Sequence, residues 1–350
     1  MNRAAKFTAA AAIMLLAVIL ISTASCSLFT PAFSTPTPTP SPVQIITEPT
    51  YSLNTINRQY EWRYSGSDWQ WTLAIPQSLY DYYVERPRAL TQDYSIYVTH
   101  PSDDEYIDTI VDKIKEVAAN SGYGDRETVN FAVSFVQGLP YAEDNVTTPY
   151  DEYPRYPIET LVDNGGDCED TSILMAAILH QMGYGVVLLS LPNHMAVGVL
   201  GGEGVSGTYF SHTDGGKYYY LETTGSGWEI GQLPPAYKDA SAYIYDITPV
   251  PILNHDWSAQ SASSKMNLTV TVENLGTATA SDFYVYAAFD AGGGIVWNPG
   301  ESQRFNLAPD QSITITMQLN MPKGEYTRLI VQIVDDGYAV DTSYSEWFDT

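Results

Sequence analysis

Two stretches in the first half of the chain place apolar residues at helical spacing. Ser102 followed by Glu105 has the pattern of a capping box, and the apolar residues after it recur at intervals of three and four: Ile107, Ile110, Val111, Ile114 and Val117. This pattern predicts a helix that begins at Ser102 and ends near Gly122. A second helix is predicted from about Asp125 to Gly138, with Val129, Ala132, Val133 and Val136 on its buried face.

A third helix and three strands are predicted in the middle of the chain. Cys168 follows two glycines and a single Asp, and the apolar residues from Ile173 to Met182 again repeat at helical spacing. We therefore expect Cys168 at the N-terminus of a helix that ends at Gly183. Short apolar runs at 186–191, 194–200 and 217–223 then predict three consecutive antiparallel strands, with His194 opening the second and Glu222 near the end of the third.

Strand patterns also occur on both sides of this region. The alternation Trp69-Gln70-Trp71-Thr72-Leu73 predicts a short strand or hairpin in an aromatic-rich segment. After residue 265, apolar residues alternate in four segments, centred near Val270, Val285, Ile315 and Val331, and turn residues separate them. Short alternating strands at this spacing are typical of an immunoglobulin-like β-sandwich.

The first 26 residues have the pattern of an export signal. Arg3 and Lys6 precede a short apolar run that ends at Ile21, and small residues then lead to Cys26. Thr23-Ala24-Ser25-Cys26 resembles the lipobox of prokaryotic lipoproteins, although Thr23 stands where an aliphatic residue is usual. The resemblance implies lipidation of Cys26 and a location on the outer face of the cytoplasmic membrane or the cell surface; an uncleaved anchor and simple secretion are the alternatives.

Composition and charge narrow the classes of protein further. The 350 residues are enough for two domains. With 16 Lys and Arg against 41 Asp and Glu, the net charge of −25 argues against nucleic acid as a partner. Only two cysteines occur, which excludes a disulfide-rich scaffold. The predicted division is a signal segment (1–26), a Pro/Thr-rich linker (27–50), an α+β domain with helices on an antiparallel sheet (51–248), a second linker (249–264) and an all-β sandwich (265–350).

The predicted elements bring together the parts of a cysteine nucleophile. A helix presents Cys168, and the sheet presents His194 as a base and Glu222 as a carboxylate that can orient the imidazole. The helix N-terminus favours the thiolate and so lowers the pKa of Cys168 below its ordinary value. The acidic residues on both sides of the cysteine raise that pKa unless they point elsewhere, and the sequence does not decide between the two effects.

Three sequence blocks resemble those of the transglutaminase-like superfamily, a branch of the papain-like cysteine enzymes. They are Gly-Gly-Asp-Cys-Glu-Asp, Asn-His-Met-Ala-Val-Gly-Val and Tyr-Tyr-Tyr-Leu-Glu-Thr-Thr, and the resemblance covers about residues 94–231. It implies a papain-like fold in which Cys168 is the nucleophile, His194 the base and acid, and Glu222 the orienting carboxylate. The family usually has Asp in place of Glu222, so Asp214 and Asn193 are alternative orienting residues.

The resemblance implies acyl transfer on protein or peptide amides, with release of the acyl group to water or to an amine. Gln137 is a candidate donor to an oxyanion, and Trp228 a candidate wall of the substrate cleft. Asn145 and Asn267 lie in glycosylation sequons. The alternative function is a catalytically silent module that binds or supports surface structures.

No cofactor or dedicated metal site is predicted. The histidines share no ligand spacing, and no His-Glu-x-x-His motif occurs. Asp163, Asp167, Glu169 and Asp170 could bind calcium but lack the EF-hand pattern, so a solvated acidic rim is the expectation. The expected partners are a protein or peptide substrate, the membrane through the N-terminal anchor, and cell-wall or surface polymer through the C-terminal module.

Overall fold

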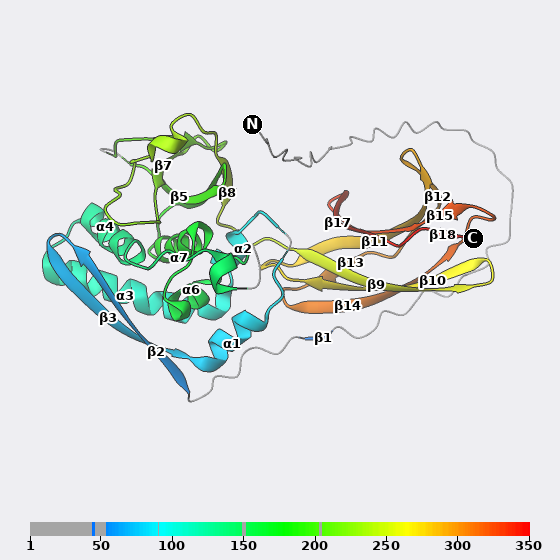
Figure 1. Ribbon diagram of the computed structural model, residues 1–350, viewed down its shortest axis with the longest axis horizontal. Coiled ribbons are helices and arrows are strands. Elements are labelled where there is room, and N and C mark those ends of the chain that lie inside the picture. Colours follow the sequence, from blue (N-terminus) through cyan, green and yellow to red (C-terminus); the bar gives the residue numbers. More distant parts are fainter. Residues whose placement is uncertain (1–43, 46–53, 90, 149–151, 203–204) are drawn as a thin grey trace, which may run out of the picture. The chain divides into compact units, whose positions relative to one another are not determined.

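The computed structural model describes residues 44–45, 54–89, 91–148, 152–202 and 205–350 (Figure 1). The predicted export segment, the lipidation of Cys26 and most of the first linker lie outside these ranges and stay predictions. The described part mixes helices with sheets, as predicted, and contains two large hydrophobic cores, one in each half of the chain.

The described N-terminal half opens with a long aromatic hairpin, drawn in dark blue in Figure 1. Strands β2 (Thr55–Tyr64) and β3 (Ser67–Pro76) pair antiparallel along their full length. The alternating side chains place Trp62 and Trp71 on one face, where both rings contact Phe135. The predicted hairpin is confirmed and is longer than the sequence pattern suggested. Helix α1 (Gln77–Glu85) follows directly. It has few buried residues, so its sequence contains no apolar repeat that would predict a helix.

Three helices follow, and each contributes buried residues to the first core. They are α2 (Ser95–Val98), α3 (Asp104–Ser121) and α4 (Asp125–Val136). The predicted start of α3 at Ser102 is wrong, because Pro101–Asp103 form a 3-10 turn and Ser102 makes no side-chain cap. Instead the Ser102 backbone N–H donates to Nδ1 of His100. The end at Gly122 is confirmed: its φ of 67° is the left-handed conformation that glycine adopts at low cost.

Helix α7 (Cys168–Gln181) is the central element of this half. The short helices α5 (Asp144–Thr147) and α6 (Pro157–Asp163) precede it. Helices α2, α3, α4 and α6 contact α7, as do strands β4 and β5. The residues from Glu169 to Leu179 are all buried. A helix that is covered on every side cannot shift without repacking the core, so its first residue has a fixed position.

A five-stranded antiparallel sheet covers α7, with strand order β6-β7-β5-β4-β8. Its strands are β4 (Val186–Leu191), β5 (His194–Leu200), β6 (Tyr209–Ser211), β7 (Lys217–Leu221) and β8 (Tyr243–Asp246). The three predicted strands and their antiparallel arrangement are confirmed. Leu221 at the end of β7 pairs with Val197 of β5. Glu222 therefore leaves the sheet at the edge where His194 enters it.

The C-terminal half is all β, coloured yellow to red in Figure 1. One sheet has the order β1-β14-β10-β9, and the other contains β12-β11-β16-β17 with β13 paired to β11. The four predicted strands are confirmed as β10 (Lys265–Asn274), β11 (Ala280–Gly292), β14 (Gln311–Asn320) and β16 (Leu329–Asp335). Their alternating apolar residues form a shared core. The remaining elements are η2 (Pro235–Tyr237), β12 (Ile295–Glu301), β13 (Phe305–Leu307), β15 (Tyr326–Thr327), β17 (Tyr338–Tyr344) and β18 (Phe348–Asp349).

Two segments predicted as linker form strands instead. Residues Leu253–Ala262 are strand β9, which pairs with β10 over its whole length, and Gln44–Ile45 are strand β1, which pairs with β14. The sequence pattern of β9 is weak because polar side chains alternate with only a few apolar ones. Its strand conformation depends on backbone hydrogen bonds to its neighbour, which a side-chain pattern does not reveal.

Candidate active site

The chain before Cys168 has a tightly constrained path. Gly165 has a φ of 145°, and a Cβ atom at this position would lie 2.3 Å from the carbonyl oxygen of Pro140. Glycine is therefore required here on both conformational and steric grounds. Helix α7 then begins with a capping box, in which Asp167 and Asp170 each accept a backbone N–H of the other. These contacts fix Cys168 as the first residue of α7, as predicted.

His194 and Glu222 contact each other directly. His194 Nε2 lies 3.1 Å from Glu222 Oε2 and 3.2 Å from the hydroxyl of Tyr220. The imidazole stacks on the ring of Tyr237, with ring centroids 4.9 Å apart and an interplanar angle of 6°. Since Nε2 is engaged by the carboxylate and the phenol, Nδ1 is the ring nitrogen left to exchange a proton with a thiol or a substrate.

Hydrogen bonds from several donors hold the Glu222 carboxylate in its charged form. Oε1 accepts from the backbone N–H groups of Thr223 and Thr224 and from the Thr224 hydroxyl, while Oε2 accepts from Tyr220 at 2.6 Å. Burial alone would raise the pKa of Glu222. The bonds from His194, Thr224 and Tyr220 outweigh that effect and lower the pKa to about 2. Glu222 is therefore ionised at neutral pH despite being buried.

The thiol of Cys168 is turned toward an acidic neighbour. Sγ donates to Glu169 Oε2 at 3.2 Å, and among the described residues no hydrogen bond joins Sγ to His194. Burial is the largest effect on the thiol and raises its pKa well above the ordinary value, and the charge of Glu169 raises it further. A hydrogen bond from the Met195 backbone acts in the opposite direction. Here, burial and Glu169 outweigh the lowering predicted from the helix N-terminus.

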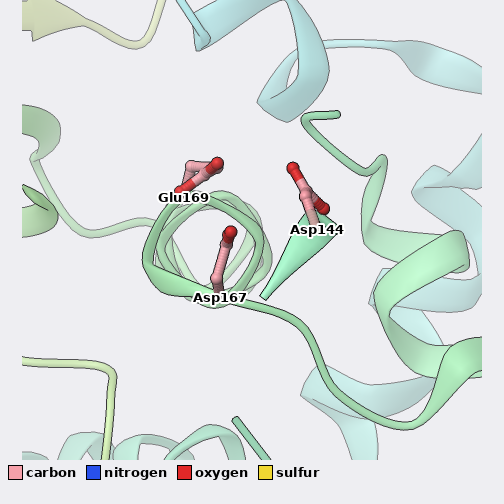
Figure 2. Close-up of side chains that lie close together, drawn as sticks. All are labelled: Asp144, Asp167 and Glu169. Atoms are coloured by element: carbon pink, nitrogen blue, oxygen red, sulfur yellow. The ribbon is translucent and has the colours of Figure 1, made fainter. Parts of the chain in front are cut away.

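Three carboxyl groups gather beside the thiol. One ligand oxygen from each of Asp144, Asp167 and Glu169 lies within 4.8 Å of the other two, and Figure 2 shows the three side chains converging. Burial, the hydrogen bond to Glu169 and the charges of Glu169 and Asp144 raise the pKa of Asp167 to about 8. The predicted solvated rim is therefore wrong for Asp167, Glu169 and Asp170, which are 9%, 7% and 0% exposed.

Asp170 belongs to a different ion-pair network. Its Oδ2 atom lies 2.5 Å from Nη1 of Arg155, and the same guanidinium contacts Asp144 at 2.8 Å and Asp163 at 3.1 Å. Burial is the largest effect on Asp170 and raises its pKa to about 7 although Arg155 lowers it. Through Arg155, this network connects α5, α6 and the first turn of α7. Among the described residues, Asp167 and Glu169 have no ion pair with a cationic side chain.

The side chain of Gln137 is buried and forms hydrogen bonds with the loop that follows Glu222. These contacts differ from the predicted role as a donor to an oxyanion. Its Nε2 donates to the carbonyl oxygens of Glu222 at 2.9 Å and Trp228 at 3.0 Å, while Oε1 accepts from the Gly227 backbone. With Nε2 already bonded to two carbonyl oxygens, no amide N–H is left to stabilise an oxyanion. Gln137 instead fixes the loop after Glu222. Trp228, predicted as a cleft wall, is half-buried at the same loop.

The other predicted site residues lie apart from this arrangement. Asp214 contacts Gly216, Tyr218 and His212, and Asn193 occupies the β4–β5 turn with a φ of 56°. Of the three candidate orienting residues, Glu222 is the one with a described contact to His194. Asn145 lies in α5, and Asn267 lies exposed on β10, where it accepts from Gln318. Within the described ranges, no helix is both long and apolar enough to cross a membrane.

Sequence reasoning assigned no role to three groups around the pair of His194 and Glu222: Tyr220 and Tyr237, which contact the imidazole, and Thr224, which contacts the carboxylate. Tyr220 precedes Glu222 by two positions, and strand periodicity puts such residues on the same face, so this contact had a sequence signal. Tyr237 comes from η2, in a loop without a repeating pattern. No sequence spacing could have placed it against His194.

Comparisons with known proteins give only partial likenesses. Neither a protein-family model nor a curated protein matched the chain. Among solved structures, a CARDB domain from Pyrococcus furiosus is 14% identical over 27% of this chain and 88% of its own, with a TM-score of 0.21. A DUF3823 family protein from Bacteroides ovatus is 15% identical over 48% of this chain and 88% of its own, with a TM-score of 0.22. A β-glucosidase from Kluyveromyces marxianus is 15% identical over 29% of this chain, with a TM-score of 0.20, and the match spans only 15% of that enzyme.

Proposed function

We propose that this protein is a transglutaminase-like cysteine enzyme that acts on protein or peptide amides. The observation that carries the proposal is the pair of His194 and Glu222, 3.1 Å apart, at the edge of the sheet that packs on the helix beginning at Cys168. A buried ionised carboxylate that orients an imidazole near a thiol is the arrangement used for nucleophilic catalysis by cysteine.

The reaction would proceed by acyl transfer. The Cys168 thiol passes its proton to Nδ1 of His194, and the sulfur then attacks the carbonyl carbon of the substrate amide. The imidazolium returns that proton to the leaving amine as the C–N bond breaks, which leaves a thioester on Cys168. Water or a second amine then attacks the thioester, loses a proton to His194, and restores the thiol. At a surface exposed to solvent, water is the more abundant acceptor, so hydrolysis is the expected outcome.

The surroundings of Glu222 suit this role. Because Glu222 stays ionised, it stabilises the imidazolium that forms when the thiol loses its proton. The bonds from Thr223, Thr224 and Tyr220 hold the longer Glu side chain in one orientation, which compensates for the extra methylene relative to Asp. Catalysis also requires the thiol to turn from Glu169 toward His194.

The remaining segments would serve export, anchoring and surface contact. Residues 1–26 would export the protein, Cys26 would carry the lipid, and the Pro/Thr-rich segment would separate the enzyme from the membrane. The C-terminal sandwich would be an immunoglobulin-like module that contacts cell-wall or surface polymer. A β-rich half with its own core supports a separate module.

The test is thiol labelling followed by substrate profiling. Iodoacetamide should alkylate Cys168 of the native protein near neutral pH, and His194→Ala should slow that labelling. His180→Ala is the matched control, because His180 lies exposed near the end of the same helix. Wild type and Cys168→Ser are then incubated with a peptide library, and cleavage is measured against amine incorporation. A thiol that reacts only in denaturant, with no turnover of any peptide, would refute the enzyme function.

The second candidate is a catalytically silent module with the same fold. The hydrogen bond from Cys168 to Glu169 favours it, since a thiol held by a carboxylate is a poor nucleophile. In that case Cys168→Ser and wild type would bind a peptide or wall polymer equally and neither would turn it over.

A further inference from the structure

A second group of reactive side chains lies in the C-terminal half, on two edge strands. Strand β9 ends one sheet and β17 ends the other, and the two strands contact each other. Nδ1 of His255 lies 2.6 Å from Oδ2 of Asp341, and Nε2 of the same ring lies 2.6 Å from the hydroxyl oxygen of Ser343. The three side chains therefore form a continuous series of contacts in the order serine, histidine, aspartate.

The hydrogen bonds in this series all have the same direction. An indole N–H can only donate, so Trp257 Nε1, 2.7 Å from the Ser343 hydroxyl, uses the serine oxygen as its acceptor. The hydroxyl hydrogen of Ser343 is then left for Nε2 of His255. An ionised carboxylate only accepts, so Asp341 holds the proton of the neutral ring on Nδ1. Nε2 is therefore the basic nitrogen and faces the serine, which is the tautomer that a serine nucleophile requires.

The imidazole is held in place, whereas the serine remains partly open to solvent. The side chain of His255 is fully buried, and Asp341 Oδ2 also accepts the backbone N–H of His255 at 2.9 Å. The ring cannot rotate without losing its contacts at both nitrogens. Ser343 is half-buried and lies between two exposed residues, Thr342 and Tyr344. The base is thus shielded from water while part of the serine is exposed, as a nucleophile at the surface of a strand requires.

We propose that Ser343, His255 and Asp341 form a second hydrolytic site, which cleaves carboxylic esters. The Ser343 hydroxyl passes its proton to Nε2 of His255 while its oxygen attacks the carbonyl carbon of the ester. The imidazolium gives that proton to the alcohol oxygen as the C–O bond breaks, which leaves the acyl group on Ser343. Water then attacks the acyl carbon and gives a proton to Nε2, and the serine oxygen takes this proton as it leaves. The products are a carboxylic acid and an alcohol.

The hydrogen-bond donor beside the serine favours esters over amides as substrates. Trp257 Nε1 already donates to the Ser343 oxygen, so it lies close to the negative charge that develops on the carbonyl oxygen after attack. A single indole donor stabilises that charge less than a pair of donors would. An ester needs less stabilisation than an amide, because an alcohol is a better leaving group than an amine. This site uses no residue of the Cys168 site, so the inference does not rest on the proposed function.

The first test is covalent labelling of the full chain that carries Cys168→Ala, so that Cys168 cannot react. A fluorophosphonate probe, which modifies activated serines, should label the native protein, and mass spectrometry of its peptides should locate the label on Ser343. His255→Ala should slow the labelling by about a hundredfold or more. Ser258→Ala, a change at an exposed serine of β9, should label like the parent. No label on Ser343 in the native parent, or equal labelling after denaturation, would overturn the site.

The second test is turnover of p-nitrophenyl acetate by the same parent protein. Ser343→Ala should lower the rate to that of buffer, and Asp341→Asn should lower it by about two to four orders of magnitude because the ring loses its tautomer. The thermal midpoint of each variant shows whether it is folded, and the labelling test needs no change in the three residues. Turnover by Ser343→Ala at the parent rate would overturn the site. A lowered midpoint in Ser343→Ala, with neither labelling nor turnover in the parent, would show that the three residues only join the two sheets.

Discussion

His194 Nε2 lies 3.1 Å from Glu222 Oε2, although the two residues are 28 positions apart in the chain. Antiparallel pairing of β5 with β7 brings the start of one strand to the end of the other and so joins the two side chains. Their contact with each other, and the donors that surround Glu222, make the pair the best-defined part of the site. Substitutions at the residues that hold this pair and Cys168 in place therefore test the site most directly.

Removing the charge of Glu222 should impair the proposed reaction strongly. Glu222→Gln keeps the size of the side chain but no longer stabilises an imidazolium, so turnover should fall by about two to four orders of magnitude. Iodoacetamide labelling of Cys168 should slow in the same variant. Glu229→Gln is the matched control because Glu229 is exposed nearby. Equal turnover by wild type and Glu222→Gln would remove this carboxylate from the site.

Glu222 should also make stability depend on pH. Its pKa is about 2 in the folded protein, below its ordinary value of 4.5, so the folded state holds the ionised form more strongly. The stabilisation is fully present above pH 4.5 and is lost as the pH falls toward 2. The free energy of unfolding is measured in urea from neutral pH down to about pH 2. It should fall less with decreasing pH in Glu222→Gln than in wild type. Parallel curves for the two proteins would contradict this assignment.

Tyr237 is expected to act as a positioning residue for His194. The two rings stack with centroids 4.9 Å apart, and this contact limits rotation of the imidazole. Tyr237→Ala should slow thiol labelling by about tenfold, whereas Tyr237→Phe keeps the ring and should restore it. If Phe fails to rescue the rate, the hydroxyl and not the stacking is the important group. If Ala has no effect, the stack does not position His194.

Gln137 should contribute to stability through the loop that follows Glu222. Its side chain makes three hydrogen bonds to the backbone there, and Gln137→Ala leaves those backbone groups without their partner. The expected loss is about 1–3 kcal/mol in urea unfolding. Gln232→Ala, a change at a more exposed glutamine, should cost much less. A fall in turnover at unchanged stability would instead restore the oxyanion role predicted from the sequence.

Gly165 should tolerate no side chain. Gly165→Ala places a Cβ atom 2.3 Å from the Pro140 carbonyl oxygen and also forces alanine into a φ of 145°. We expect a loss of about 3 kcal/mol or more in unfolding free energy. Gly183→Ala is the control, since its φ is 93° but nothing lies within 4 Å of the added atom. Its loss should be about 1 kcal/mol, from backbone strain alone. Equal losses would show that the contact with Pro140 relaxes freely.

Local sequence patterns determined most of the long helices and strands and several of the residues at their ends. The helical repeat after Cys168 and the three apolar runs after Gly183 are properties of short segments. The apolar side chains of these segments are buried in the structure, as their patterns predict. These patterns are sufficient to place Cys168, His194 and Glu222 at the ends of their elements. Where the local pattern was weak, α1 was not predicted and β9 was predicted as linker, because partners distant in sequence stabilise those segments.

Only the tertiary structure decided how the chemical groups meet. The sequence by itself determined that acidic residues flank Cys168, but not that Asp167 and Glu169 are buried beside Asp144, nor that Glu169 accepts the thiol hydrogen bond. It likewise placed Gln137 at the end of α4 without revealing that its amide is occupied by the loop after Glu222. Side-chain pKa values and hydrogen bonds depend on distances between segments far apart in the chain, and those distances are set by the packing of α7 against the sheet and the surrounding helices.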